Sequence, residues 1–202
     1  CTKVSNLLCR WRKSSPGDLK YRDLNGDGII SADLDREVIG DAYPRYNYSF
    51  RLDAAYHNFD LSVFLQGVGQ ANGYITGPGL HAYNADAAFP QEVHLDRWTP
   101  QNTGGSYPRF VYKDSRNTGR LADYWLQDAA YLRVKNLQLG YTIPGNFLQK
   151  IHVQRLRIYA SADNLFTDTN FFYAYDPESQ ATSGGLYPQV KTFIFGLSIQ
   201  LK

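Results

Sequence analysis

Apolar and polar residues alternate along several stretches of the chain, and the first of these stretches spans residues 46–56. Its even positions carry apolar or aromatic residues: Tyr46, Tyr48, Phe50, Leu52, Ala54 and Tyr56. The odd positions between them are mostly polar. Because successive side chains of a β-strand point to opposite faces, this pattern predicts a strand with one apolar and one polar face.

A second alternating stretch, residues 59–66, follows after only two residues. Its apolar positions are Phe59, Leu61, Val63 and Leu65. Two alternating runs joined by the short connection 57–58 predict a β-hairpin. Each run has about ten residues, the length that a tilted strand needs to cross a lipid bilayer.

Three later stretches alternate in the same way: Ala130–Ile143, Val153–Ala162 and Thr192–Lys202. In the first of them the apolar residues change from even to odd positions near Lys135 and Asn136. A β-bulge, which adds one residue to a strand, returns such a pattern to a single face. The sequence therefore predicts about five antiparallel strands with a bulge in the third.

The connections between the predicted strands alternate in length. Residues 57–58 and 144–152 are short, whereas residues 15–44, 70–129 and 163–190 are long and rich in Gly, Pro, Asn, Asp and Tyr. In an up-and-down sheet successive connections lie at opposite ends, so all the long ones are expected at one end. Outer-membrane barrels have this asymmetry, with long loops outside the cell and short periplasmic turns.

A soluble β-sandwich or barrel predicts the same alternation, because its apolar strand faces point into a core. Two features favour a membrane barrel instead. Four charged residues on the polar faces, expected to face a water-filled lumen, are Arg51, Asp53, Arg155 and Arg157. Five long strands also leave two open edges that a soluble domain has to protect. We therefore predict an all-β fold of antiparallel up-and-down strands, forming a segment of a large transmembrane β-barrel with long extracellular loops.

Composition narrows the classes of function. The chain has 202 residues, with 21 basic and 19 acidic residues and no basic block, which argues against nucleic acid as a partner. Aromatic residues make up 15%, more than a soluble core needs. Only Cys1 and Cys9 are available for disulfides or thiolate ligands, which excludes a disulfide scaffold and a four-cysteine zinc site. No G-x-S-x-G, glycine-rich phosphate loop or HExxH occurs, so the chain is not expected to be an enzyme.

Six blocks of sequence are more specific. In chain order they are GDLKYRDLNGDGII, VIGDAYPRYNYSF, FDLSVFLQGVGQ, DAAYLRVKNLQLGYTIP, LRIYASADNLF, and YDPE with YPQVKTFIFGLSI. Together they resemble the C-terminal part of a SusC/RagA-type TonB-dependent outer-membrane receptor. Residues 1–16 match no block and stay unassigned, whereas residues 17–202 are expected to form the C-terminal segment of the receptor barrel.

This resemblance implies the last five strands of a barrel of about 22 strands, set in the lipid of the outer membrane of a Gram-negative bacterium. It also implies import of an oligosaccharide or a peptide together with a SusD-like surface lipoprotein. The energy is expected to come from the TonB complex through a plug domain that this chain does not contain.

Residues 23–28, Asp-Leu-Asn-Gly-Asp-Gly, match the first half of a calcium-binding loop, with oxygen ligands at positions 1, 3 and 5 and glycine at position 6. Position 12, where a bidentate carboxylate is expected, holds Leu34 between two aspartates. The candidate ligands are Asp23, Asn25, Asp27, Ile29, Ser31, Asp33 and Asp35. We expect a structural Ca²⁺ ion that stiffens the loop. The alternative is a turn rich in Asp, Asn and Gly with solvated carboxylates.

The long connection 70–129 is rich in aromatic residues, whose faces stack on sugar rings and on peptide side chains. The candidate contacts for cargo or a partner protein are Tyr74, Tyr83, Trp98, Tyr107 and Tyr112. The alternative is that these rings pack the loop against itself or form the aromatic girdle of a barrel.

A second function, from a different class, also stays open. The chain is then a soluble or lipid-anchored extracellular β-domain that binds glycan through its aromatic residues, with a lipid on Cys1. The other interpretation of Cys1 is that it begins a piece cut from a longer receptor.

Overall fold

The computed structural model describes residues 15–41, 43–77, 90–112, 117, 120–148, 153–173, 175–179 and 189–201. The chain divides into two compact units. The loop unit comprises Cys1–Gly40, Gly73–Gln127 and Ser179–Leu186, and the sheet unit comprises Asp41–Asn72, Asp128–Glu178 and Tyr187–Lys202. No helix in the described ranges is long and apolar enough to cross a membrane.

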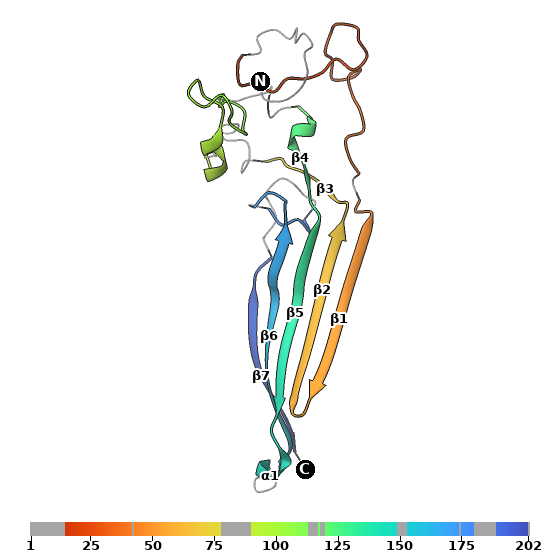
Figure 1. Cartoon of the computed structure of the whole chain (residues 1–202), viewed down its shortest axis with the longest axis vertical. Coiled ribbons are helices and arrows are strands. Elements are labelled where there is room, and N and C mark those ends of the chain that lie inside the picture. Colours follow the sequence, from red (N-terminus) through yellow and green to blue (C-terminus); the bar gives the residue numbers. More distant parts are fainter. Residues whose placement is uncertain are drawn as a thin grey trace. The chain divides into compact units, whose positions relative to one another are not determined.

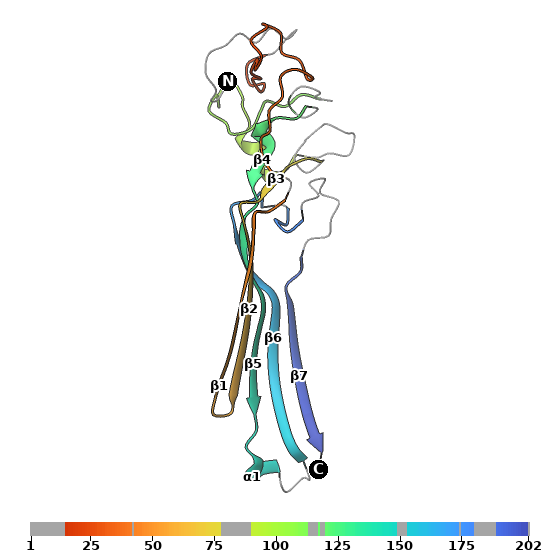
Figure 2. The same ribbon diagram turned by 90° about the vertical axis from the view of Figure 1, so that its right-hand side faces the viewer.

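The sheet unit contains five antiparallel strands in the order β1-β2-β5-β6-β7 (Figure 1). Their bounds are Tyr46–Tyr56 for β1, Phe59–Gly69 for β2, Tyr131–Thr142 for β5, Val153–Thr169 for β6 and Thr192–Leu201 for β7. Figure 2 shows the same strands turned by 90°, with β6 and β7 curved along their length. The predicted all-β, up-and-down arrangement is confirmed, with one short helix, α1 (Gly145–Leu148), between β5 and β6.

The strand register places the predicted apolar positions on one face of the sheet. One row across all five strands consists of Leu52, Val63, Leu137, Ala162 and Phe193. The next row, on the opposite face, consists of Asp53, Ser62, Gln138, Ser161 and Ile194. The alternation seen in each strand therefore adds up to a continuous apolar face and a mostly polar face.

The bulge predicted near Lys135 is present in β5. The pairing of β5 with β6 shifts between Val134 and Asn136, and the pairing with β2 shifts at the same level, between Phe64 and Leu65. Because one residue is added, the apolar side chains before and after the bulge lie on the same face.

Strand β6 extends further than the alternation predicts. The apolar pattern of β6 stops at Ala162, because Asp163 and Asn164 follow, yet the strand continues to Thr169. Asn164 has a positive φ of 51°, and its side-chain amide donates to the carbonyl oxygen of Val190 at 3.2 Å. This bond allows the strand to continue through the polar residues Asp163 and Asn164.

The described residues of the long connection between β2 and β5 form four short elements. They are β3 (Asn72–Tyr74), the 3-10 helices η1 (Glu92–Asp96) and η2 (Asp123–Trp125), and β4 (Leu126–Asp128), which pairs with β3. The buried core of the loop unit includes Ile75 and Trp125. The indole N–H of Trp125 donates to the carbonyl oxygen of Asn117 at 2.8 Å.

Candidate functional site

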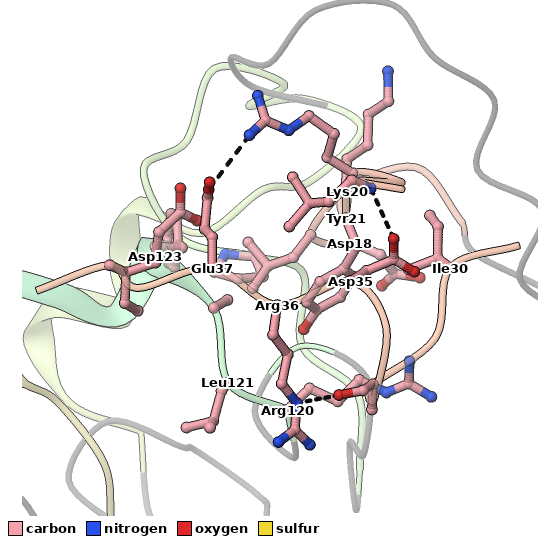
Figure 3. A pocket seen from close by; sticks show the side chains of 18 of the residues that line it. Asp18, Lys20, Tyr21, Ile30, Asp35, Arg36, Glu37, Arg120, Leu121 and Asp123 are labelled. Atoms are coloured by element: carbon pink, nitrogen blue, oxygen red, sulfur yellow. Dashed lines mark hydrogen bonds and ion pairs between the residues drawn. The ribbon is translucent and has the colours of Figure 1, made fainter. Parts of the chain in front are cut away.

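The loop unit encloses a cavity of about 990 Å³, shown in Figure 3. Residues 17–22 and 30–37 contribute to one part of its lining, and residues 106–108 and 120–124 to another. Tyr74 and Trp98 complete the aromatic part. The cavity thus brings together the predicted metal loop and some of the predicted aromatic contacts, which lie far apart in the sequence.

Asp18 joins the segments that form this cavity. Its carboxylate accepts hydrogen bonds from Arg109 Nε at 2.6 Å, from Asn117 Nδ2 at 3.2 Å and from the backbone N–H of Ser15 at 2.8 Å. Burial by itself raises the pKa of Asp18, but the hydrogen bonds from Arg109, Ser15 and Asn117 outweigh it and leave the pKa below its usual value. Asp18 is therefore a buried, charged anchor.

In the predicted metal loop, the side-chain oxygens accept hydrogen bonds from nearby backbone N–H groups. Asp23 accepts from Gly26 at 2.7 Å and from Gly28 at 2.8 Å. Both glycines have a φ of 78°, a conformation that other residues rarely adopt. Asn25 and Asp27 each accept from the N–H two residues later, at 3.0 and 2.7 Å. The loop is thus preordered with its oxygen-bearing side chains turned inward on the chain.

Leu34 occupies position 12 of the calcium pattern, but the carboxylate that closes the loop belongs to the next residue, Asp35. Its carboxylate accepts from the N–H groups of Ser31 at 2.6 Å and Leu24 at 2.8 Å, and these bonds lower its pKa. Leu34 is 64% exposed, and Asp33 points outward to pair with Arg36 at 3.6 Å. Ser31 uses its hydroxyl to accept from the N–H of Leu34 at 3.0 Å.

Ile29, another candidate ligand, is exposed, and its N–H binds Asp27. Over the described ranges, no group of three or more acidic, histidine or cysteine side chains is placed so that it could hold a metal ion.

Three of the predicted aromatic contacts line the cavity: Tyr74, Trp98 and Tyr107. Each also has a packing role. Tyr74 accepts from the N–H of Ala122 at 3.1 Å, and burial raises its pKa. The Trp98 ring lies against Gly17, and Tyr107 packs edge-on to Trp125 with ring centroids 5.6 Å apart.

Tyr112, another predicted contact, is not among the residues that line this cavity. Tyr112 is 63% exposed. Tyr83 lies outside the described residues.

Charges of both signs line the cavity in equal number. The cations are Lys20, Arg22, Arg36 and Arg120, and the anions are Asp18, Asp35, Glu37 and Asp123. Arg22 pairs with Glu37 at 3.4 Å. Such a lining suits a neutral ligand or one that carries both charges, and it does not favour a polyanion.

The predicted lumen-facing residues lie on the polar face of the sheet. Arg51 pairs with Asp53 along β1 at 2.8 Å. Arg157 donates to Asp60 at 2.9 Å, and Arg155 is exposed beside them. The register therefore groups these charges on one face of the sheet.

The alternation does not reveal one buried ionic cluster on this face. Arg133 on β5 bonds to Asp176 and Glu178, which lie 43 and 45 residues later. Its partners belong to the YDPE block, so the cluster joins two of the sequence blocks that carry the family resemblance. The sequence contains both blocks, but nothing in it predicts that they are in contact.

Comparisons with known proteins were made for the whole chain. No family model matches the sequence. The chain is 34% identical over 200 residues to TonB-dependent receptor P3 of Formosa agariphila, an alignment that covers 93% of this chain and 19% of the receptor. It is 26% identical over 201 residues to TonB-dependent receptor SusC of Bacteroides thetaiotaomicron, covering 92% of this chain and 18% of SusC. The chain therefore spans about a fifth of the length of the curated relatives it matches.

A solved structure has a fold similar to that of this chain. The RagAB peptide importer in the 'open-open' state matches with a TM-score of 0.68 and 21% identity, covering 90% of this chain and 20% of that chain. The barrel-segment fold is confirmed. The matched proteins are receptors and importers, in agreement with the prediction that the chain is not an enzyme.

Proposed function

Because the chain is homologous to a segment of SusC/RagA-type TonB-dependent receptors, we propose that it forms part of the barrel wall of a nutrient importer in the outer membrane of a Gram-negative bacterium. In this proposal the five strands are the C-terminal part of the wall. The long connections face the outside of the cell, and the short turns face the periplasm.

The observation that carries this proposal is the exposed apolar face of the sheet. Phe50 is 58% exposed, Phe193 62% and Phe195 83%, and all three lie on the same face. Soluble monomers rarely expose a continuous apolar surface larger than a few hundred square ångströms. Against lipid tails, such a face avoids the free-energy penalty of exposing apolar surface to water.

Aromatic residues mark both ends of this face. Tyr46 and Tyr48 lie at one end of β1, while Tyr56, Phe59 and Tyr141 lie in one row at the other. Belts of tyrosine, tryptophan and phenylalanine are typical of barrels at the two membrane interfaces. The proposal therefore sets the two boundaries of the membrane at these rows.

For the cargo we propose an oligosaccharide or a peptide, captured together with a SusD-like surface lipoprotein. The cavity of the loop unit supports an uncharged or zwitterionic cargo, because its lining carries as many cations as anions. Energy from the TonB complex would arrive through a plug domain elsewhere in a longer receptor.

We also propose that the loop 23–35 binds a structural Ca²⁺ ion. Asp23, Asn25, Asp27 and Asp35 offer the hard oxygen ligands that this ion prefers. In the structure these oxygens accept hydrogen bonds from backbone N–H groups of the loop, so the proposal requires the ion to draw the side chains together. The ion would add electrostatic cross-linking of the loop and no catalytic chemistry.

The intact mass and membrane fraction of the native polypeptide test the main proposal. We expect a protein several times larger than 22.9 kDa in the outer membrane, extracted only with detergent. An isolated chain that is soluble, monomeric and cooperatively folded in plain buffer contradicts it and favours the glycan-binding β-domain.

A further inference from the structure

Arg133 is a charged side chain that is buried in the sheet unit, with 3% of its surface exposed. Each guanidinium nitrogen has a partner: Nε donates to Thr167 Oγ1, Nη1 to Glu178 and Nη2 to Asp176, all at 2.8 Å. Lys135 donates to the same Glu178 carboxylate at 2.7 Å. A buried guanidinium is tolerated only when its N–H groups are satisfied, so these carboxylates are obligatory partners.

The cluster lies on the polar face of the sheet. Arg133 alternates with Leu132 and Val134, which point to the apolar face. Residues 170–173 and 175–178, which follow the end of β6, therefore fold back over the polar face to reach Arg133. We call these residues the ledge.

The ledge is fixed at further points. Thr169 Oγ1 donates to the carbonyl oxygen of Ala130 at 2.8 Å and accepts from the N–H of Phe171 at 3.1 Å. The N–H of Tyr175 donates to the carbonyl oxygen of Phe172 at 3.0 Å. These bonds and the Arg133 cluster tie the ledge to the strands near both of its ends.

The ledge also has an inner and an outer side. Phe171 and Phe172 are 6% and 7% exposed, and Tyr131 on the strand beneath is 4% exposed. Tyr173 is 67% exposed, although its ring centroid lies only 4.9 Å from that of Phe172. The ledge thus buries two aromatic rings and projects a third.

We propose that the ledge is a permanent constriction at the outer mouth of the barrel, latched by Arg133, with Tyr173 as its projecting side chain. The inference rests on the proposed function, in which the polar face lines the lumen and the β6–β7 connection lies outside the cell. Because the ledge is tied to the strands near both of its ends, the proposal gives it a fixed limit on the width of the cargo and not the role of a mobile gate.

Hydrogen exchange of the full-length receptor in detergent tests the latch. In Arg133→Met the amides of the ledge should exchange at least about tenfold faster, because the variant removes every bond of the cluster to Arg133. The matched control is Arg45→Met, which removes a solvent-exposed pair with Asp41 in the same unit and should leave the ledge unchanged. Fast exchange of the ledge in the wild-type receptor, or no change in Arg133→Met, overturns the proposal.

Arg133→Met could unfold the sheet as a whole, and Glu178→Gln guards against this outcome. The variant keeps a hydrogen-bond acceptor for Arg133 and Lys135 and removes only the charge. We expect faster exchange confined to the ledge. Unchanged exchange of the ledge in Glu178→Gln counts against the latch, whatever Arg133→Met does.

Thiol labelling in intact cells tests the place of the ledge, with Tyr173→Cys in a receptor whose native cysteines are replaced by serine. A small, membrane-impermeant maleimide should react, whereas a bulky polyethylene-glycol maleimide should react only after Arg133→Met releases the ledge. Equal reaction with both reagents in the latched receptor refutes the constriction. A receptor that is missing from the outer membrane refutes the proposed function instead, and hydrogen exchange still decides the latch.

Discussion

Arg157 on β6 bonds to Asp60 on β2, although β5 lies between these two strands. Its Nε donates to Asp60 Oδ1 at 2.9 Å, and a second bond runs from Nη2 to Oδ2. Gly140 lies directly opposite Asp60 on the intervening strand. A Cβ at Gly140 would be 2.5 Å from the Arg157 nitrogen and from both carboxylate oxygens, so only glycine leaves room for this ion pair.

The first prediction is that Gly140→Ala destabilises the barrel wall by about 1–3 kcal/mol, because the ion pair or the strand has to move. Thermal unfolding of the full-length receptor, followed by its heat-dependent mobility on gels, measures this loss. Gly145→Ala is the matched control in the same unit, since a Cβ there has no atom within 4 Å. Equal effects of the two variants contradict the steric argument.

The second prediction concerns Asp18 and acid. Because its pKa is lower in the folded protein than the ordinary 3.8, Asp18 stabilises the loop unit fully above that value. This contribution is lost as the pH falls through the lowered pKa. Asp18→Asn should therefore cost about 1.5–3 kcal/mol at neutral pH and weaken the acid dependence of loop-unit stability.

Limited proteolysis of the loop unit across a pH series measures the effect of Asp18→Asn. The control is Asp33→Asn, whose side chain is 93% exposed and which should change neither rate nor pH dependence. A variant at Asp18 that keeps the wild-type pH profile means that another group is responsible for acid sensitivity.

The strands could be predicted from the sequence because a barrel wall has a different environment on each face. Most residues of β1 indicate by their polarity the face on which they lie, and the phase change near Lys135 indicates the bulge. The end of β6 could not be predicted, because Asp163 and Asn164 are polar for a different reason. Asp163 accepts from Asn136 at 2.7 Å, and Asn164 holds the chain before β7.

The cavity could be predicted only in its parts. Asp18 and Asn117 are 99 residues apart, and a single sequence gives no sign that they bond. Residues 23–35 form a loop closed by the carboxylate of Asp35, one position later than the calcium pattern requires. The Asp35 carboxylate accepts hydrogen bonds from the N–H groups of Leu24 and Ser31, and these contacts depend on the backbone geometry of the loop.

The third prediction is that Gly17→Ala disrupts the aromatic wall of the cavity. Gly17 has a φ of 90°, and a Cβ there would lie 2.5 Å from the Trp98 ring. Strain and steric overlap together should cost about 1–3 kcal/mol and raise the hydrogen-exchange rates of residues 96–110. Gly104→Ala, where a Cβ has no atom within 4 Å, should leave those rates unchanged.

The fourth prediction is that the full-length receptor binds Ca²⁺ in the loop 23–35 and that Asp27→Ala abolishes this site. Asp27 accepts one backbone hydrogen bond, from the N–H of Ile29, so its removal takes away a ligand and leaves most of the loop in place. Isothermal titration calorimetry with calcium chloride measures the loss of heat. Asp35→Ala is a poor choice for this test, because Asp35 accepts from three backbone N–H groups and its removal unfolds the loop itself.

Asp33→Ala separates the calcium site from general charge effects. This carboxylate has the same charge as Asp27 and lies in the same loop, but it points outward to Arg36. If calcium is held by the inward side chains, Asp33→Ala should keep the binding heat of the wild type. No heat in the wild-type receptor removes the site altogether, and loss of heat in Asp33→Ala moves the ligands to the outer side of the loop.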